Sequence, residues 1–347
     1  MPKRIIGLDI SARRLLAVEV EGSTSRHPKL VRTHAVALPE GAARDSEVVN
    51  VPEVSQALRT LWKEGGFRSK RVVLGVGNQR VLVRDHTVPM IPLDQLRQSL
   101  PFQVADLLPV PVNETILDFY PIAEVPDSAP PEMRGLLVAA IKDSIETNVT
   151  TLEDAGLKTV GVDLSPFAMI RAITAGGPIT GSHTVVMIGA HTTYIVVILD
   201  GVPQFVRIVP AGGDTLTEAA EEATGMNQQD AEELKYRIGI EKGADPEYRD
   251  AADAMLGALR SIFGSIRSTN SYYLGNYPGS SIAGIILLGQ ETLVPGLARA
   301  VTEHVGLPTV VGDPLHGLQV SDEIAPDALA ALTPDLAIPL GLALGSK

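Results

Sequence analysis

Two short turns in the sequence have residue types suited to binding an anion. Asp9-Ile10-Ser11-Ala12 joins two apolar runs, and its backbone amides could face an anion above the Asp9 carboxylate. Gly189-Ala190-His191-Thr192-Thr193 repeats the pattern with a glycine and two hydroxyl side chains. Two facing turns of this kind would cradle two phosphates, and Asp9 would hold a hydrated Mg²⁺. Ordinary hairpin turns contain the same residues, and turn chemistry alone favours that simpler interpretation.

Two glycine-containing segments precede expected helices. Gly212-Gly213-Asp214 comes before a helix expected over Thr215–Ala223, and Leu287-Leu288-Gly289-Gln290 ends an apolar strand before a helix expected from Pro295. The N-terminus of a helix that follows a parallel strand is a usual ligand contact in α/β proteins. A plain connecting loop explains the second segment equally well, and the first is a weak signal alone.

Several other kinds of site are excluded by composition and motif. The chain has no cysteine, which excludes disulfides and thiol chemistry, and no pair of histidines spaced for zinc. P-loop, dinucleotide-binding and nucleophile-elbow motifs are absent. With 29 basic and 41 acidic residues the net charge is −12, so a nucleic-acid partner is not expected.

The turns are positioned by a pattern of strands that occurs twice. Apolar runs predict a hairpin of Arg4–Ile10 and Leu15–Val20 with a third strand over Val31–Leu38. A second hairpin of His183–Ile188 and Tyr194–Leu199 precedes a strand over Gln204–Val209. The hairpins begin at residues 4 and 183 of 347, which indicates duplication of one α/β domain around a cleft. Two unrelated hairpins are the alternative.

The remaining segments alternate between helical and strand patterns. Helices are expected at Asp45–Glu64, Leu93–Leu107, Asp143–Ala155, Ser165–Ile173, Ala231–Tyr236, Ala251–Tyr273 and Pro295–Val305, and a mainly helical tail at Ala328–Leu344. Strands are expected at Arg71–Val76, Val81–Val88, Thr115–Ile122, Gly135–Ile141, Thr159–Leu164 and Ile282–Leu288. The longest uncharged stretch, Ala172–Leu199, contains glycines and a proline, so no membrane span is expected; no secretory signal is expected either. A cytoplasmic location follows as an expectation.

These segments resemble the actin-like ATPase superfamily (actin, Hsp70 and FtsA), and more specifically the PilM family of type IV pilus assembly. The most specific stretch is Leu93–Phe119, which contains a helix, a Pro-x-Pro turn and a strand ending in Leu-Asp-Phe. The resemblance covers nearly the whole chain. Further matching motifs are Val162–Ala168, Pro210–Thr217, Ala231–Lys235 and Leu287–Ala298.

The resemblance implies a fold. Two duplicated ribonuclease H-like α/β domains would surround a central cleft, with an inserted α+β subdomain. The first domain would comprise residues 1–80, 158–181 and 328–347, the inserted subdomain residues 81–157, and the second domain residues 182–327.

The resemblance also implies ATP and Mg²⁺ as cofactors. The first turn would be the phosphate 1 loop, the Gly189 turn the phosphate 2 loop, and Gly289 the adenosine loop. Asp9 would be the metal ligand. The implied cofactor-binding residues are Asp9, Ser11, Ala12, Gly189, Ala190, His191, Thr192, Gly212, Gly213, Glu232, Lys235, Gly289 and Gln290.

The chain departs from the family pattern at the cofactor positions. Ser11-Ala12 stands where the phosphate 1 loop has Gly-Ser/Thr, and Met187 stands where the phosphate 2 loop begins with Asp. Gln290-Glu291 replaces further glycines, and Ser165 replaces an acidic or amide residue. A thioether is a poor ligand for Mg²⁺. We therefore expect a degenerate cleft with weak or absent ATP binding and no catalytic residue.

The resemblance implies a peptide partner as well. PilM-like proteins bind the cytoplasmic N-terminal peptide of PilN, a membrane-anchored protein, in a groove near the inserted subdomain. The predicted contacts are Phe102, Leu107 and Val110; for Leu107, as for Val104, packing in the subdomain's own core is the favoured interpretation. Pro101 is expected to interrupt the helix that carries them. Pilus motor ATPases would be further partners, and the protein would lie at the inner face of the cytoplasmic membrane.

Three alternatives stay open. The first is an active ATPase of the same fold. The second is an FtsA-like division protein or a GspL-like secretion protein. A sugar kinase would need a catalytic aspartate in a sugar pocket, and the sequence offers no supported candidate.

Overall fold

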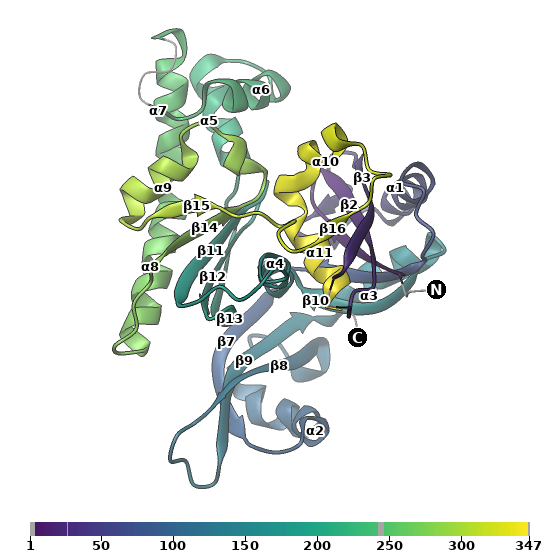
Figure 1. Cartoon of the computed structure of the whole chain (residues 1–347), viewed down its shortest axis with the longest axis vertical. Helices are drawn as coiled ribbons and strands as arrows, with labels where there is room; N and C mark the ends of the chain where they lie inside the picture. The colour runs from purple at the N-terminus through teal and green to yellow at the C-terminus, as the bar shows by residue number, and fades with distance from the viewer. Residues whose placement is uncertain (1–3, 26, 242–245, 346–347) are drawn as a thin grey trace.

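The computed structural model describes residues 4–25, 27–241 and 246–345, arranged as two α/β halves and a smaller third unit (Figure 1). The actin-like fold predicted from the resemblance is confirmed: each half contains a mixed sheet, and the third unit has its own antiparallel sheet. The predicted residue boundaries of the three units remain a prediction, and residues 1–3 and 346–347 of the first one lie outside the described residues.

The first half is built on a six-stranded sheet in the order β10-β6-β1-β2-β3-β16. The predicted hairpin forms β1 and β2, which pair antiparallel and continue antiparallel into β3. On the other side of β1, β6 and then β10 add in parallel. The strands are β1 (Arg4–Ile10), β2 (Arg14–Glu21), β3 (Lys29–Ala37), β6 (Arg71–Val76), β10 (Lys158–Leu164) and β16 (Gln319–Val320).

The second half repeats this topology in the order β13-β12-β11-β14-β15. Here too an antiparallel hairpin continues into an antiparallel third strand, and two strands add in parallel beside the first. The strands are β11 (Ser182–Ile188), β12 (Thr193–Leu199), β13 (Val202–Val209), β14 (Gly284–Leu288) and β15 (Thr309–Val311). The repeated hairpins therefore occupy equivalent places in two sheets of the same strand order.

The third unit is a sheet in the order β7-β9-β8, antiparallel throughout. Its strands are β7 (Val81–Pro89), β8 (Thr115–Glu124) and β9 (Glu132–Ile141). The helix α2 (Leu93–Val104) packs on it through Leu96, Leu100 and Val104, which are all buried. Pro101 does not end this helix as expected, because α2 continues past it to Val104; a kink at Pro101 stays a prediction.

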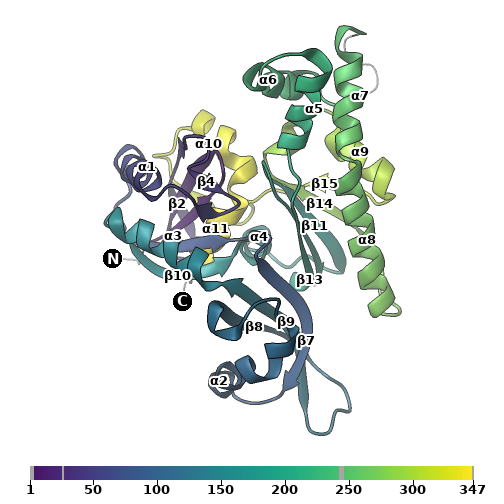
Figure 2. The same cartoon turned by 180° about the vertical axis from the view of Figure 1, so that it is seen from behind.

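Two helices join the halves. The helix α4 (Ser165–Ile173) lies between the two sheets in opposite views (Figures 1 and 2). It shares one core cluster with Val18 of the first sheet and Val196 of the second. The helix α11 (Ala337–Leu344) packs directly on α4 and β1. A Cβ at Gly341 would lie 1.7 Å from the Ala168 carbonyl oxygen, so this contact requires glycine.

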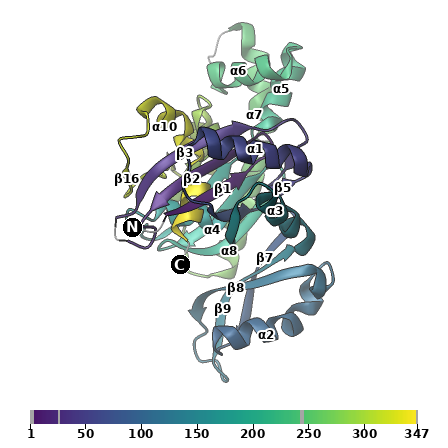
Figure 3. The same ribbon diagram turned by 90° about the vertical axis from the view of Figure 1, so that its right-hand side faces the viewer.

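The other helices lie around the two sheets. The first sheet is covered by α1 (Val51–Glu64) and α3 (Lys142–Asp154), as Figure 3 shows. On the second sheet, α8 (Arg260–Asn276) and α9 (Leu297–Val305) contact the strands, whereas α5 (Asp214–Thr224), α6 (Gln228–Ile238) and α7 (Arg249–Ala258) pack on one another beyond its end. The helix α10 (Pro326–Leu332) precedes α11 near the first sheet.

Several predicted helix bounds differ from the observed ones, and three of the differences have a clear local cause. The first helix begins at Val51 rather than Asp45, because Asp45 and Ser46 have positive φ in a turn between the short strands β4 (Ala43–Arg44) and β5 (Glu47–Val48), and Asn50 caps the helix. The helix expected over 251–273 is divided into α7 and α8 at Leu259. The helix expected from Pro295 begins at Leu297, after Gly296 in a left-handed conformation.

No single helix in the described ranges is long and apolar enough to cross a membrane. The segments 326–335 and 337–344 satisfy the length and composition test only together, as a pair bent by 86°.

Candidate functional site

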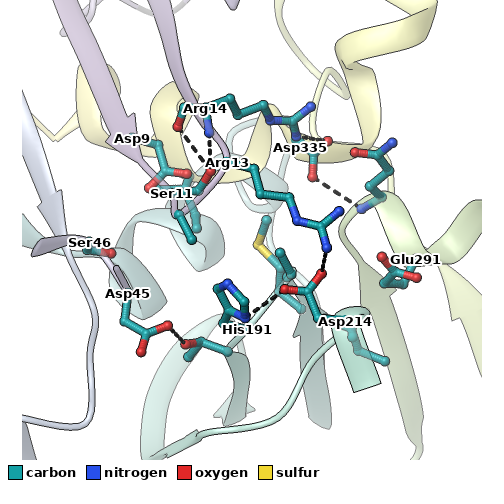
Figure 4. A pocket seen from close by; sticks show the side chains of 18 of the residues that line it. Asp9, Ser11, Arg13, Arg14, Asp45, Ser46, His191, Asp214, Glu291 and Asp335 are labelled. Carbon is teal, nitrogen blue, oxygen red and sulfur yellow. Dashed lines mark hydrogen bonds and ion pairs between the residues drawn. The ribbon is translucent and has the colours of Figure 1, made fainter. Parts of the chain in front are cut away.

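The two predicted turns face each other across one cavity between the halves (Figure 4). The cavity has a volume of about 320 Å³. The turn after β1 forms one wall and the turn after β11 the other, so the duplication brings together two segments that lie far apart in the sequence.

The first turn is closed by Ser11. Its amide donates to the Arg14 carbonyl over 3.0 Å, and its hydroxyl donates to the same oxygen over 3.0 Å. Asp9, the last residue but one of β1, lines the cavity beside this turn. Burial raises the pKa of the Asp9 carboxyl to about 6, although Arg14 opposes this effect. The carboxyl therefore keeps its proton to a higher pH than an exposed aspartate does.

The second turn is supported by the glycine segment before α5. Gly189 donates to Thr192, while the amides of Gly213 and Asp214 donate to the carbonyls of Gly189 and Ala190. A Cβ at Gly212 would lie 2.3 Å from the Gly189 oxygen, so only glycine permits this close approach. The glycine segment thus stabilises the second turn from behind.

An ion-pair network crosses the cleft from the first half to the second. The Arg13 guanidinium pairs with Asp214, at the start of α5, and with Glu232 of α6. His191 Nδ1 lies 2.6 Å from the other oxygen of Asp214. Asp214 is therefore shared between an arginine of the first turn and a histidine of the second (Figure 4).

The network changes the protonation of its members. The hydrogen bond to Asp214 raises the pKa of His191. Burial alone would raise the pKa of Asp214, but the His191 hydrogen bond and the Arg13 charge outweigh it and hold that pKa below its ordinary value. Burial opposes the charge of Arg13, yet Asp214 and Glu232 raise its pKa. The favoured state is an anionic Asp214 between two cations.

Two further hydrogen bonds connect the halves. The Thr192 hydroxyl donates to Asp45 over 2.9 Å, and the Tyr194 hydroxyl donates to the Gly77 carbonyl over 2.7 Å. The pKa of Tyr194 is raised above its ordinary value, chiefly by burial, so its hydroxyl remains a donor. Polar contacts therefore connect the two halves at several points around the cavity.

The loop after β14 forms the third side of the site. Gly289 has φ of +96°, and a Cβ there would lie 2.4 Å from the Ile188 carbonyl oxygen. The next amide, of Gln290, donates to Asp335 over 3.2 Å, and Asp335 also pairs with Arg14. The predicted glycine is thus required by the backbone, and the loop is tied to the first turn through Asp335.

A buried ion pair lies behind the cavity wall. Lys235 Nζ is 3.1 Å from Glu291, which also accepts the Tyr236 hydroxyl over 3.0 Å. Lys235 and Glu291 are 1% and 4% exposed. Lys235, predicted to bind the cofactor, therefore has its ammonium group bound to a protein carboxylate.

Most of the predicted cofactor-binding residues line the cavity. They are Asp9, Ser11, Ala12, Gly189, Ala190, His191, Thr192, Glu232 and Gln290. Gly212, Gly213, Lys235 and Gly289 do not line it and instead support its walls. A role for any of these residues in binding a nucleotide stays a prediction.

Several residues that line the cavity were not predicted. They are chiefly Arg13, Arg14, Asp45, Ser46, Asp214, Tyr236, Glu291 and Asp335. The sequence pointed to only some of them. Arg13 and Arg14 directly follow the first turn, and Asp214 directly follows Gly212-Gly213.

Metal-binding groups are sparse at this site. In the described part of the chain, no three His, Asp or Glu side chains form a group able to hold a metal ion. Met187, at the position where the family pattern has a carboxylate, lines the cavity. In contrast, the amides of Ala12, Arg13, Ala190 and His191 have no protein acceptor among the described residues.

The predicted partner residues lie on and after α2. Phe102 is 87% exposed, Leu107 is exposed and Val110 is half-buried. The interpretation that Leu107 packs in the core is therefore wrong, whereas Val104 is fully buried. A nearby apolar cavity of about 270 Å³ lies between α2 and the sheet and is lined by residues such as Leu96 and Phe119, but not by the three predicted contacts.

Comparison with known proteins gives a consistent family. A family model described as type IV pilus assembly protein PilM matches residues 7–347. Among solved structures, a PilM–PilN type IV pilus biogenesis complex superposes with a TM-score of 0.85 and 26% identity, covering 98% of this chain and 97% of that one. MreB5 of Spiroplasma citri bound to ADP superposes with a TM-score of 0.54 and 12% identity over 90% of this chain and 93% of its own, a likeness of fold alone.

Curated relatives are cell division proteins. FtsA of Streptococcus pneumoniae is 27% identical over 195 residues, which are 51% of this chain and 42% of that protein. FtsA of Neisseria meningitidis is 22% identical over 91% of this chain and 85% of that protein. The match to the first spans less than half of that relative's length.

Proposed function

The chain belongs to the PilM family of type IV pilus assembly proteins, and from this premise we propose that it is a scaffold that binds the cytoplasmic N-terminal tail of a PilN-like membrane protein. The observation that carries the proposal is the likeness to the PilM–PilN complex, which extends over nearly all of both chains. In this role the protein would lie at the inner face of the cytoplasmic membrane and would connect that partner to the pilus motor ATPases.

The tail is proposed to bind beside α2. Phe102 is a large apolar side chain left exposed on this helix, and Leu107 is exposed in the turn that follows. Val110 lies between Pro109 and Pro111, which favour an extended backbone. Exposed apolar side chains along an extended segment suit a peptide with alternating anchors.

A pull-down with the first twenty or so residues of the membrane partner tests this placement. Val110→Asp and Phe102→Ser are expected to weaken capture at least tenfold. Val310→Asp is the matched control, because Val310 is 59% exposed on β15 in the other half of the molecule. If Val110→Asp folds normally and holds the peptide with unchanged affinity, the groove lies elsewhere.

We further propose that the cleft is degenerate as a site for magnesium and nucleotide. The support is the chemistry of its lining: a thioether at Met187 where the family has a carboxylate, and no cluster of metal-binding side chains within the described ranges. A nucleotide would also have to displace or redirect Arg13, whose guanidinium is already paired with two carboxylates. These residues do not fit Mg²⁺-ATP.

Calorimetry with Mg²⁺-ATP tests the degenerate cleft. We expect a Kd weaker than about 100 μM, equivalent to less than about 5.5 kcal/mol of binding free energy, and negligible turnover. Met187→Asp alone should not restore turnover, because Gln290 and Glu291 still occupy the loop after Gly289. Submicromolar affinity with steady hydrolysis would overturn the proposal.

An active ATPase is the second candidate. The observation in its favour is that four amides of the two turns, among them those of Ala12 and Ala190, face no protein acceptor and could bind phosphate. The same calorimetry separates the candidates, whereas the tail-binding experiment is independent of both.

A further inference from the structure

A groove opens beside two strands, β7 and β13, that lie at the edges of different sheets and contact each other over part of their length. Within the described structure β7 pairs only with β9 and β13 only with β12, so one side of each strand has no strand partner. The groove between them has a volume of about 960 Å³. Residues 81–85 of β7 form one wall, residues 205–208 of β13 the opposite wall, and α8 adds Tyr272. Figure 2 shows β7 beside β13.

The lining pattern identifies this as an edge groove. Successive side chains of a strand point to opposite faces of its sheet, so a cavity above one face contacts only every second residue. Here five consecutive residues of β7 and four of β13 line the same space. The groove therefore runs along the strand edges, where unpaired N–H and C=O groups are available to an added strand.

The side chains of the groove carry unpaired positive charge. Arg84 is exposed on β7 and has no acidic partner in the described part of the chain. Arg207 is exposed on β13, and its guanidinium donates to the Ser268 hydroxyl over 2.8 Å rather than to a carboxylate. The one carboxylate in the lining, Asp85, already accepts the Tyr277 hydroxyl and lies 3.7 Å from Arg134. The groove thus has two arginines free for an acidic ligand, in a chain of net charge −12.

An apolar contact lies at one side of these arginines. Phe205 and Tyr272 pack ring against ring, with centroids 4.9 Å apart, and Tyr272 remains 52% exposed. Exposed aromatic surface next to arginine is typical of the centre of a binding interface.

We propose that this groove binds an extended acidic peptide segment of another protein, which lies along the edge of β7 and pairs with its free backbone groups. Its carboxylates pair with Arg84 and Arg207, and an apolar side chain between them packs on Tyr272. Five residues in extended conformation span about 17 Å. This site is separate from α2 and does not depend on the tail-binding proposal.

Fluorescence anisotropy with the full-length chain tests the site. The probe is a labelled hexapeptide that alternates aspartate with valine and phenylalanine, and its counterpart has lysine for aspartate. We expect only the acidic peptide to bind, with affinity reduced at least tenfold in Arg84→Glu/Arg207→Glu. Arg260→Glu, the same charge reversal at the exposed start of α8, should bind as the wild type does. Binding of neither peptide, or equal binding of both, overturns the proposal.

A second arm tests strand addition itself. The acidic peptide methylated at alternate backbone nitrogens keeps its charge but cannot donate those hydrogen bonds, and we expect its binding to fall at least tenfold. Unchanged binding would exclude strand addition. Self-association of the wild-type chain that is lost in Arg84→Glu/Arg207→Glu would identify a second copy as the occupant and would also overturn the proposal. Val110→Asp should leave acidic-peptide binding intact, which separates this site from the tail site.

Discussion

Asp214 is the side chain on which the cross-cleft contacts converge. It is only 5% exposed, and isolated burial of a carboxylate is costly. Two cations from opposite walls, Arg13 and His191, offset that cost. The Asp214 charge is therefore paired within the protein. Of its two partners, His191 is the one whose charge changes near physiological pH.

The pH dependence of His191 follows from these contacts. Its pKa is raised above the ordinary 6.5 by Asp214, with Asp45 adding and Arg13 opposing. The stabilisation is therefore complete below pH 6.5 and is lost as pH rises through the folded-state pKa. The ring is almost half exposed, so solvent screening limits the effect to about 0.3–1 kcal/mol. His191→Gln should be less stable than wild type at pH 6 and nearly equal at pH 9, as measured by urea unfolding.

Asp214→Asn provides the control for the His191 prediction. In that background, the loss of unfolding free energy caused by His191→Gln should depend far less on pH, because only the weaker attraction of Asp45 remains. A pH-dependent cost that persists undiminished in Asp214→Asn would assign the effect to another group.

The buried pair of Lys235 and Glu291 predicts an asymmetric mutational result. Lys235→Met leaves a buried carboxylate with only the Tyr236 hydroxyl, and we expect it to destabilise the fold by about 3–5 kcal/mol. Lys235→Met/Glu291→Leu removes both charges and should recover most of that loss. Urea unfolding of the two variants measures the difference, and a double variant no more stable than Lys235→Met would refute the reasoning.

At the scale of elements, α11 approaches α4 and β1 more closely than any side chain would allow. Gly341→Ala places a Cβ 1.7 Å from the Ala168 carbonyl oxygen, so the helices must separate, at a cost of about 3 kcal/mol. Gly264→Ala is the matched substitution in α8, where nothing lies within 4 Å of the new Cβ; it should stabilise by about 0.5–1 kcal/mol. Thermal unfolding of both variants tests the contact, and similar melting temperatures would contradict it.

Elements with a strong local pattern could be predicted from the sequence. Both hairpins and their third strands are confirmed because each is a run of apolar residues bounded by turns. The strands β15 and β16 were missed because three and two residues are too short to show a period. The break between α7 and α8 is not marked by a proline, and a single glycine, Gly257, does not by itself predict the end of a helix.

The site was predictable only as far as local sequence determines it. Gly189 was found because its turn repeats the first one, and Gly289 because a glycine there ends an apolar strand, where the backbone has φ of +96°. The partners of Arg13 could not be found, because Asp214 and Glu232 lie more than 200 residues away and meet it only through the packing of the two halves. Exposure likewise depends on packing, which is why Leu107 could not be separated from Val104.

At the scale of the whole molecule, the halves are held together by a shared core on one side and by charge on the other. The core cluster around α4 joins both sheets through apolar contacts, which salt and anions do not displace. Across the cleft the connection depends on the ion pairs of Arg13 and on a few hydrogen bonds, those of Thr192, Tyr194 and the Gln290 amide. Salt and competing anions weaken partly exposed ion pairs, so the cleft side is the side expected to open.

Arg13→Ala should therefore loosen the cleft without unfolding either half. We expect a loss of about 1–3 kcal/mol and faster hydrogen exchange in the first turn, in α6 and at the start of α5, with the α4 core still protected. Arg171→Ala is the matched control, because Arg171 pairs with Asp163 within the first half at a similar exposure. It should lower stability without increasing exchange in α6. In wild type, exchange in α6 should rise with salt, and in Arg13→Ala it should already be high and independent of salt. Equal exchange of α6 in wild type and Arg13→Ala at low salt would mean that the shared core alone holds the halves closed.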